Sequence, residues 1–172
     1  DWLAERSLRV FAINGFPYGD FHDEVVKHAV YRPDWTDPTR SGYTLRLAEL
    51  LAGLLEPERT GGVSTVPLGW GAAMDDDAVA HAAERLRELC VELERLEERT
   101  GRCIHVDLEP EPGCAIERLD GLAMFFERHL LGGDDEQRVR RYLRACVDCC
   151  HAAVMFEDFE SGIDALDDRS IA

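Results

Sequence analysis

The apolar positions along the chain follow two kinds of pattern, one typical of buried strands and one typical of amphipathic helices. Short apolar runs bounded by Gly, Pro or Asp predict four strands. These strands span residues 8–14, 62–68, 103–109 and 141–148. Apolar positions at helical spacing predict four helices between and after these runs. The helices span residues 43–55, 77–99, 116–131 and 158–167.

Capping and turn residues set several of these predicted boundaries. Thr36 or Asp37 is expected to cap the first helix, with Pro38 in its first turn. Gly101 is expected to end the longest helix. The start of the fourth strand has a second interpretation, because residues 141 onward are equally consistent with the end of a helix that begins at Asp134.

The order of elements is strand, loop and helix, repeated along the chain. Such alternation predicts a parallel sheet with helices packed against it, and therefore an α/β fold. A flavodoxin-like or Rossmann sheet fits the alternation too, but no G-x-G-x-x-G sequence opens any predicted helix. The chain has 172 residues, against ~250 in a complete TIM barrel.

We therefore expect a single domain, residues 1–172, that forms about four βα units of a larger (β/α)8 barrel. The chain begins at Asp1 rather than at a methionine and reaches Ala172 without an obvious terminal element, which favours a fragment. A partial barrel has two open sheet edges. We expect a protein made of these residues alone to associate, for example as a homo-oligomer.

Composition narrows the class of protein. Hydrophobic residues make up 45% of the chain and charged residues 31%, which is ordinary for a globular protein. The formal net charge of −16 repels phosphate backbones, so we expect no nucleic-acid partner. The six cysteines of a chain with this much core material favour reduced thiols in a cytoplasmic protein. No apolar run approaches the ~18 residues of a membrane span.

Polar side chains follow every predicted strand. In parallel α/β folds the functional site lies at the carboxyl ends of the strands, so these residues are the candidates for function. The expected substrate contacts are Asn14, Tyr18, Asp20 and His22 after the first strand and Trp70 after the second. The alternative for the loop that holds Tyr18 and His22 is a self-packed surface loop.

The third predicted strand has one polar face. His105, Asp107 and Glu109 lie on that face, and apolar residues lie on the other. Carboxylates that face a protein interior are costly unless they are paired or bind a cation. For Asp107, pairing with an Arg or with backbone groups is an equal alternative. For Glu109, at the end of the strand, we favour a functional role.

Glu109 and Asp148 end neighbouring strands and are expected to converge, with His151 three residues beyond Asp148. Two carboxylates and one imidazole suit Mg²⁺, Mn²⁺ or Zn²⁺. The predicted metal ligands are therefore Glu109, Asp148 and His151. We expect His151 and Glu111 to act as the catalytic groups, which transfer protons.

Other histidines and cysteines carry weaker signals. Cys146 and Cys149 form a C-x-x-C sequence, followed by Cys150, but no second ligand pair lies at a spacing suitable for structural zinc. Small buried thiols are the preferred interpretation. The remaining histidines are expected on helix or loop surfaces without a role; they are His28, His81 and His129.

Two short motifs resemble the xylose-isomerase-like TIM-barrel superfamily, which includes sugar isomerases, epimerases and endonuclease IV. They are Leu108-Glu109-Pro110 and Asp148-Cys149-Cys150-His151. Members of that superfamily typically carry a metal-binding Glu after the fifth strand and an Asp-x-x-His after the sixth. The resemblance implies that Glu109 and Asp148 are metal ligands and that His151 is a ligand or a substrate contact.

Longer strings resemble the Ebo-cluster metabolite-traffic family, and this resemblance spans nearly the whole chain. The strings are residues 14–22, 30–35, 64–70, 108–114 and 148–158. The resemblance implies that the four strands are the third to the sixth of the barrel. The superfamily takes further metal ligands from its seventh and eighth strands, and this chain does not contain them. The histidines that endonuclease IV carries after earlier strands have no clear equivalents at Asn14 or Ser64.

The leading hypothesis is a divalent-metal site that acts on a small polar metabolite, either polyhydroxylated or phosphorylated. The reaction would be an isomerisation or epimerisation by proton transfer. The first alternative is a non-catalytic protein that binds or carries a metabolite in secondary-metabolite biosynthesis or traffic. The second alternative is a metal-dependent hydrolase or nuclease. Because an activity inferred from a superfamily rests on analogy, the metal site is the part of the hypothesis to test first.

Overall fold

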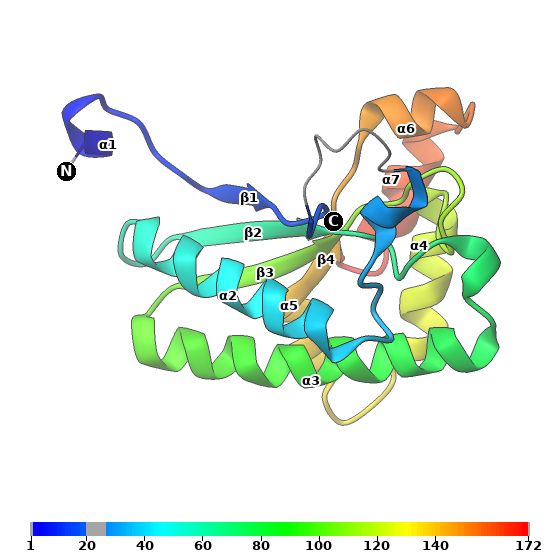
Figure 1. Ribbon diagram of the computed structural model, residues 1–172, viewed down its shortest axis with the longest axis horizontal. Helices are drawn as coiled ribbons and strands as arrows, with labels where there is room; N and C mark the ends of the chain where they lie inside the picture. Colours follow the sequence, from blue (N-terminus) through cyan, green and yellow to red (C-terminus); the bar gives the residue numbers. More distant parts are fainter. Residues whose placement is uncertain (1, 20–26, 172) are drawn as a thin grey trace.

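The computed structural model describes residues 2–19 and 27–171 (Figure 1). The elements, in chain order, are α1 (Trp2–Glu5), β1 (Ala12–Asn14), the 3₁₀ helix η1 (Lys27–Tyr31), α2 (Pro38–Leu54), β2 (Thr60–Thr65), the 3₁₀ helix η2 (Gly71–Ala73), α3 (Asp76–Thr100), β3 (Cys103–Leu108), α4 (Leu119–Phe125), the π-helix η3 (Phe126–Leu130), α5 (Glu136–Tyr142), β4 (Leu143–Ala145), α6 (Cys149–Val154) and α7 (Phe159–Asp167). Within the described residues, no helix is both long enough and apolar enough to cross a membrane.

The four strands form one parallel sheet in the order β1-β2-β3-β4. Asn14 is in register with Ser64, Ser64 with Asp107, and Asp107 with Arg144. The α/β fold expected from the sequence is therefore confirmed. Consecutive strands are neighbours, so right-handed crossovers place their connecting helices on the same face of the sheet.

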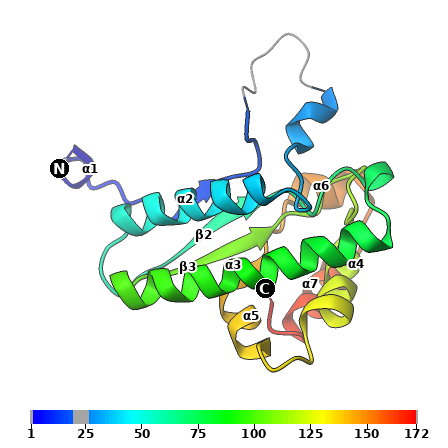
Figure 2. The same ribbon diagram turned by 60° about the horizontal axis from the view of Figure 1, so that its bottom comes forward.

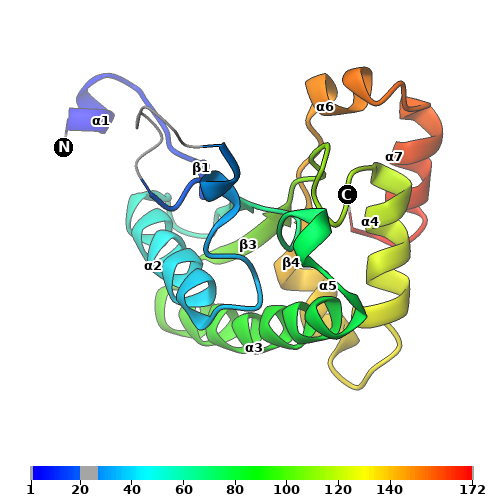
Figure 3. The ribbon, with the colours of Figure 1, turned by 45° about the vertical axis from the view of Figure 1, so that its right-hand side comes forward.

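That helix-covered face holds the core. Val63, Ile104, Val106, Leu108 and Leu143 are fully buried. Helices α2, α3 and α5 pack against these strands, and α2 and α3 run alongside β2 and β3 (Figure 2). Figure 3 shows α2, α3, α4 and α7 in an arc around the sheet.

The opposite face of the sheet is polar and open to solvent. Ser64, His105, Asp107 and Glu109 are half-buried on this face, and Asn14 is exposed. We call it the open face. The alternation predicted for the third strand is therefore present, with apolar residues toward the helices and polar residues away from them.

The two long helices begin and end at the residues that the sequence indicates. Asp37 caps α2 by accepting from Thr39 N at 2.8 Å, and Pro38 follows in the first turn. Gly101 ends α3 in the left-handed conformation, with φ of 68°. The α3 stripe is buried as its spacing predicts, through Leu86, Leu89, Leu93 and Leu96.

All four strands are shorter in the structure than predicted; β2 and β3 each differ in length by one residue, and the first and fourth strands differ most. The first begins at Ala12, and the expectation that residues 8–11 are buried is wrong, because Leu8 is 50% and Phe11 is 72% exposed. β1 lies at an edge and pairs only with β2 among the described strands, so nothing buries these side chains from the other side.

The fourth strand begins at Leu143, because α5 continues to Tyr142. The alternative of a helix ending in this region is therefore correct. Val139 and Tyr142 are both buried and lie at helical spacing, which supports the helix.

Two further differences, and one agreement, concern helices near the carboxyl end of the chain. The helix expected over residues 116–131 begins at Leu119 and continues from Phe126 as a π-helix. Helix α6 was not predicted, and it occupies part of the loop after the fourth strand. Helix α7 (Phe159–Asp167) lies within the predicted range, and its Gly162 packs closely against Leu119 of α4.

The outer edge of β4 is not entirely bare. Ala145 N donates to Ile171 O at 2.8 Å, and the Ile171 side chain is fully buried. Ile171 thus lies where the next parallel strand of the sheet would pair with β4.

Candidate functional site

Three of the predicted residues meet at the carboxyl end of the sheet. The ligand atoms of Glu109, Asp148 and His151 lie within 4.8 Å of one another. Among residues 2–19 and 27–171, no other group of three or more His, Cys, Asp or Glu side chains is arranged to hold a metal ion. The helices α4, α6 and α7 gather at this same end (Figure 1).

Strand pairing positions Glu109. Its backbone N–H donates to Thr65 O at 3.1 Å, and Cys146 N donates to the preceding Leu108 O at 2.9 Å. Burial raises the pKa of the Glu109 carboxyl, and the neighbouring carboxylates of Asp148 and Glu111 raise it further, against a lowering by His151 and by a hydrogen bond with Ser64. Glu109 is thus a carboxylate held where water solvates it poorly.

Asp148 is the N-cap of α6. Its Oδ1 accepts from Cys150 N at 2.6 Å and from His151 N at 3.1 Å. Desolvation raises the pKa of Asp148, but these backbone hydrogen bonds outweigh it and the net pKa is lowered. The second oxygen, Oδ2, faces the His151 ring, with 3.7 Å between Oδ2 and Nε2.

A backbone carbonyl orients His151. Its Nδ1 lies 2.9 Å from Pro110 O, and because a carbonyl oxygen only accepts, Nδ1 carries the proton. Nε2 then points to Glu111 Oε2 at 3.3 Å and to Asp148 Oδ2 at 3.7 Å. In the neutral ring, Nε2 presents a lone pair to these carboxylate oxygens. That arrangement is repulsive unless Nε2 is protonated or a cation lies between them.

Glu111 links the three residues to the rings of Tyr31, Trp70 and Phe16, which we call the aromatic wall. Tyr31 Oη donates to Glu111 Oε1 at 3.3 Å. The Tyr31 ring lies 4.9 Å from Trp70 and 5.9 Å from Phe16, measured between ring centroids. Burial, with the charges of Glu111 and Cys114, raises the pKa of Tyr31 to about 12. Tyr31 therefore remains a hydrogen-bond donor across the physiological pH range.

The other predicted substrate contacts have different surroundings. Trp70 is covered by neighbours, since His28 lies 4.3 Å from its ring centroid and any Cβ added at Gly113 would meet its ring. Asn14 uses its Oδ1 to accept from Phe16 N at 2.9 Å. Tyr18 packs edge-on against Tyr43, 5.0 Å away. Asp20 and His22 lie outside the described residues.

No pattern in the sequence indicates the contacts that His28 and Tyr31 make. His28 was expected to be without a role, yet its ring packs against Trp70, and Tyr31 was not among the predicted site residues. Both residues precede a proline-rich stretch without periodicity. Only the three-dimensional path of η1 brings them to this wall.

Below the three residues, the open face carries a second polar pair. His105 Nδ1 contacts Asp107 Oδ1, and both side chains are about one-sixth exposed, at 15% and 16%. Gly62 on β2 makes room for them, because a Cβ at that position would lie 2.7 Å from His105 Cε1. Asp107 is therefore paired by a neighbouring imidazole on its own strand, which sequence reasoning did not consider.

The cysteines of the C-x-x-C sequence do not form a metal group in the described structure. The expectation that they are buried is wrong for Cys149 and Cys150, which are exposed at the start of α6. Cys146 is partly buried beside Glu109, and burial, with the charge of Glu109, raises the pKa of its thiol to about 12. Cys146 is therefore a neutral neighbour of the site at physiological pH.

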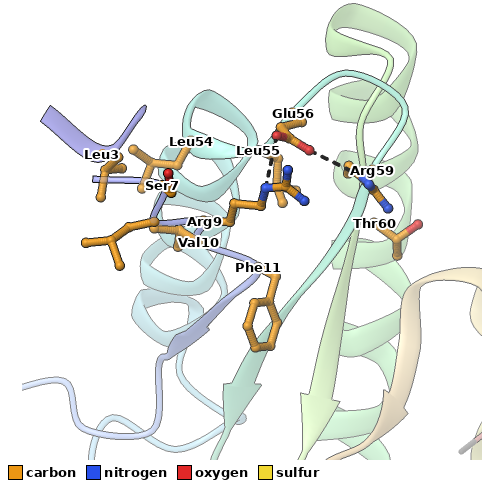
Figure 4. A pocket seen from close by; sticks show the side chains of 11 residues that line it. Leu3, Ser7, Arg9, Val10, Phe11, Leu54, Leu55, Glu56, Arg59 and Thr60 are labelled. Carbon is orange, nitrogen blue, oxygen red and sulfur yellow. Dashed lines mark ion pairs between the residues drawn. The ribbon is translucent and has the colours of Figure 1, made fainter. Parts of the chain in front are cut away.

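A hollow of about 600 Å³ lies at the opposite end of the sheet (Figure 4). Leu3, Phe11 and Leu54 are among the apolar residues that line it, while Arg9 and Arg59 both reach Glu56, at 3.3 and 3.5 Å. This hollow opens at the amino ends of β1 and β2, away from Glu109. The pairs that line it are largely exposed, so they contribute little to folding.

No family model matches this chain, and no curated protein matches it. What can be said of function therefore rests on the residues and their arrangement. The class of site that they define is a cluster of two carboxylates and one imidazole at the carboxyl end of a parallel α/β sheet.

Proposed function

We propose that Glu109, Asp148 and His151 bind a divalent cation and that this chain forms part of a metal-dependent (β/α)8 barrel. The observation that carries the cation site is the orientation of His151. Its Nδ1–H donates to Pro110 O, and its Nε2 faces the carboxylates of Glu111 at 3.3 Å and Asp148 at 3.7 Å. Protonation of Nε2 supplies one positive charge against the carboxylates of Glu109, Glu111 and Asp148, whereas a divalent cation supplies two.

Three features of the sheet support a barrel. The strand order follows the chain order, the packed helices lie on one face, and the other face is polar. A doubly wound sheet reverses its strand order at a switch point and has helices on both faces. Ile171 on the outer edge of β4 supports continuation of the sheet beyond four strands. The similarity of the quoted sequence strings to the Ebo-cluster family and the xylose-isomerase-like superfamily agrees with this fold.

The donor set favours Mn²⁺, Zn²⁺ or Mg²⁺. Three protein ligands leave positions for substrate oxygens or water, as in catalytic rather than structural metal sites. Such a cation polarises a carbonyl or hydroxyl group of the substrate. The substrate that fits is a small polyhydroxylated or phosphorylated metabolite.

The side chains around the cation site are suited to proton transfer. Glu111 lies against His151 Nε2 on one side and accepts from Tyr31 on the other. Its carboxylate can accept a proton from a substrate held beside the site, and the neutral Tyr31 hydroxyl holds it in place. The proposed reaction class is isomerisation or epimerisation.

Metal titration tests the proposal directly. Metal-stripped protein is titrated with Mn²⁺, Zn²⁺ and Mg²⁺ by isothermal titration calorimetry, beside Glu109→Gln and Asp148→Asn. We expect one ion per chain in the wild type, and loss of each ligand should weaken binding at least ~100-fold. Asp158→Asn is the matched control, because Asp158 also caps a helix, accepting from Ser161 N at 3.3 Å, without a cation site beside it.

Two outcomes would contradict the proposal. One is a wild-type protein that binds none of the three metals, and the other is undiminished binding in both ligand variants. Metal binding without turnover of sugars or sugar phosphates would leave the cation site in place and favour the metabolite-binding alternative over an enzyme.

A further inference from the structure

Helix α6 carries His151, and it is too short to hold itself in place. It spans six residues, Cys149–Val154, and helices of this length are marginal in water without tertiary contacts. One of its residues, Ala152, is buried. The direction in which His151 points is therefore decided by what fixes the two ends of α6.

The far end of α6 is a strained turn. Phe156 has φ of 52°, in the left-handed region that bulky side chains rarely adopt. Phe156 N donates to Ala153 O at 3.1 Å and Glu157 N to Ala152 O at 3.0 Å. The Phe156 side chain is 94% exposed, so its own packing does not compensate the strain. Such conformations persist where the surroundings over-determine them.

Two hydrogen bonds from the start of α4 hold this turn on both sides of Phe156. The Arg118 guanidinium donates to Met155 O at 2.7 Å, and Leu119 N donates to Glu157 Oε2 at 3.0 Å. Arg118 occupies the N-cap position of α4 but makes no side-chain cap of its own, and Glu157 supplies the missing acceptor. We call this pair of bonds the 118/157 clamp.

The clamp is anchored on the core. Leu119 is 2% exposed, and α7 packs against it at Gly162, where an added Cβ would lie 2.8 Å from Leu119 Cδ1. The start of α4 is therefore a fixed point. The exposed turn after α6 is tied to it, and α6 cannot rotate without breaking the clamp.

The clamp also joins the two halves of the candidate site. Arg118 ends the loop that begins with Glu109, whereas Glu157 follows the helix that carries His151. The bond from His151 Nδ1 to Pro110 O is a third tie between the same two segments. The relative position of Glu109 and His151 depends on these bonds between segments that lie about 40 residues apart in sequence, with separations of 37, 38 and 41 residues.

We propose that Arg118 and Glu157 are positioning residues that set the affinity of the cation site by fixing α6 against the loop after β3. This inference rests on the proposed function, since the affinity in question is that of Glu109, Asp148 and His151. Neither residue is among those ligands. Their effect is to hold His151 and Glu109 at the distance that a shared cation requires.

Metal affinity measured apart from fold stability tests the proposal. Glu157→Ala and Arg118→Ala should each weaken Mn²⁺ or Zn²⁺ binding by about 10-fold in calorimetric titration. Glu157→Gln keeps an acceptor for Leu119 N and should recover most of the affinity. The matched controls are Glu136→Ala and Arg102→Ala, which remove the same kinds of bond elsewhere, to Gly132 N at 2.8 Å and to Leu55 O at 2.9 Å.

A double variant separates positioning from simple destabilisation. In Glu157→Ala/Phe156→Gly, glycine adopts the left-handed turn without strain, so the melting temperature should recover. Under the proposal the metal affinity stays low, because the tie to α4 is still missing. Affinity that returns together with the melting temperature would overturn the positioning role.

The remaining outcomes distinguish the role of the clamp from the existence of the cation site on which it rests. A wild-type protein that binds no metal overturns the cation site and the clamp's role together. A wild-type protein that binds metal, with clamp variants that bind as tightly as the controls, overturns the clamp alone.

Discussion

Alternate residues of β3, together with Glu109 directly after it, face opposite environments. The residues on one face stabilise the fold, whereas the other face carries part of the candidate site. Ile104, Val106 and Leu108 are fully buried against the helices, whereas His105, Asp107 and Glu109 lie half-buried on the open face. The apolar side gains free energy by leaving water. On the polar side, burial raises the pKa of Glu109, so holding that carboxylate ionised costs free energy.

This contrast indicates which face serves the fold and which serves the site. A residue whose ionised form is disfavoured by its own environment is not there for stability. Removing an apolar side chain from the helix-covered face should therefore destabilise the fold and spare metal binding. Neutralising Glu109 on the open face should instead stabilise the metal-free fold and remove metal binding.

The largest expected change in the free energy of unfolding comes from a substitution on the helix-covered face. Ile104→Ala removes a fully buried side chain and should lower the free energy of unfolding by about 2–5 kcal/mol. Because Ile104 points away from the site, metal affinity should stay within about 2-fold of the wild type. Urea denaturation and calorimetric titration measure the two quantities. A loss of affinity as large as that of Glu109→Gln would break the distinction between the faces.

A smaller loss of stability is expected at Gly62, where side chains crowd the open face. Gly62→Ala places a Cβ 2.7 Å from His105 Cε1 and against Asp107, so it should destabilise the protein by about 1–3 kcal/mol. Gly53→Ala in α2 is the matched control, because nothing lies within 4 Å of its added Cβ and it should raise stability by about 0.5–1 kcal/mol. Equal melting temperatures for the two variants would show that the His105–Asp107 pair does not fill the space over Gly62.

The smallest expected change in the free energy of unfolding is an increase, caused by a substitution at Glu109. Glu109→Gln should raise the free energy of unfolding of the metal-free protein by about 0.5–2 kcal/mol near neutral pH, while it abolishes metal binding. In the folded state the pKa of the Glu109 carboxyl is raised above its ordinary value of 4.5, so at pH values between the two the folded state holds a proton that the unfolded chain has lost. Stability from this group is therefore present below 4.5 and lost as the pH rises through the raised pKa.

The pH dependence gives this prediction its check. The advantage of Glu109→Gln should shrink as the pH falls toward about 4, because Glu109 is then protonated in both states. Asp148 behaves oppositely, since its pKa is lowered from 3.8 and its contribution is lost as the pH falls. An advantage that is independent of pH would argue against a desolvated Glu109.

Much of the architecture could be predicted because its signals are local. Helix α3 combines an apolar stripe with a C-terminal glycine, and β3 shows strict alternation, so both fall within one residue of their predicted bounds. Asp37 and Pro38 mark the start of α2 by capping chemistry alone. The positions of the predicted strand ends indicated which residues after β3 and β4 would converge, and Glu109, Asp148 and His151 do lie together.

The predictions from sequence fail where contacts between distant segments determine the local structure. Six residues are too few for a periodic pattern to indicate α6, which forms because Asp148 caps it and the 118/157 clamp holds its other end. Residues 8–11 have the composition of a buried strand but lie at an edge. The tie from His151 to Pro110 ends on a backbone carbonyl, which leaves no mark in the sequence.

The exposure of Cys149 and Cys150 has a consequence for chemical labelling. Burial raises the pKa of the Cys90, Cys114 and Cys146 thiols to about 12, so these three do not supply thiolate to an alkylating reagent near neutral pH. Cys149 and Cys150 are the two exposed thiols among the six cysteines, and they directly follow Asp148. A fluorophore attached to either thiol would therefore report on the surroundings of the proposed cation site without the introduction of a new cysteine.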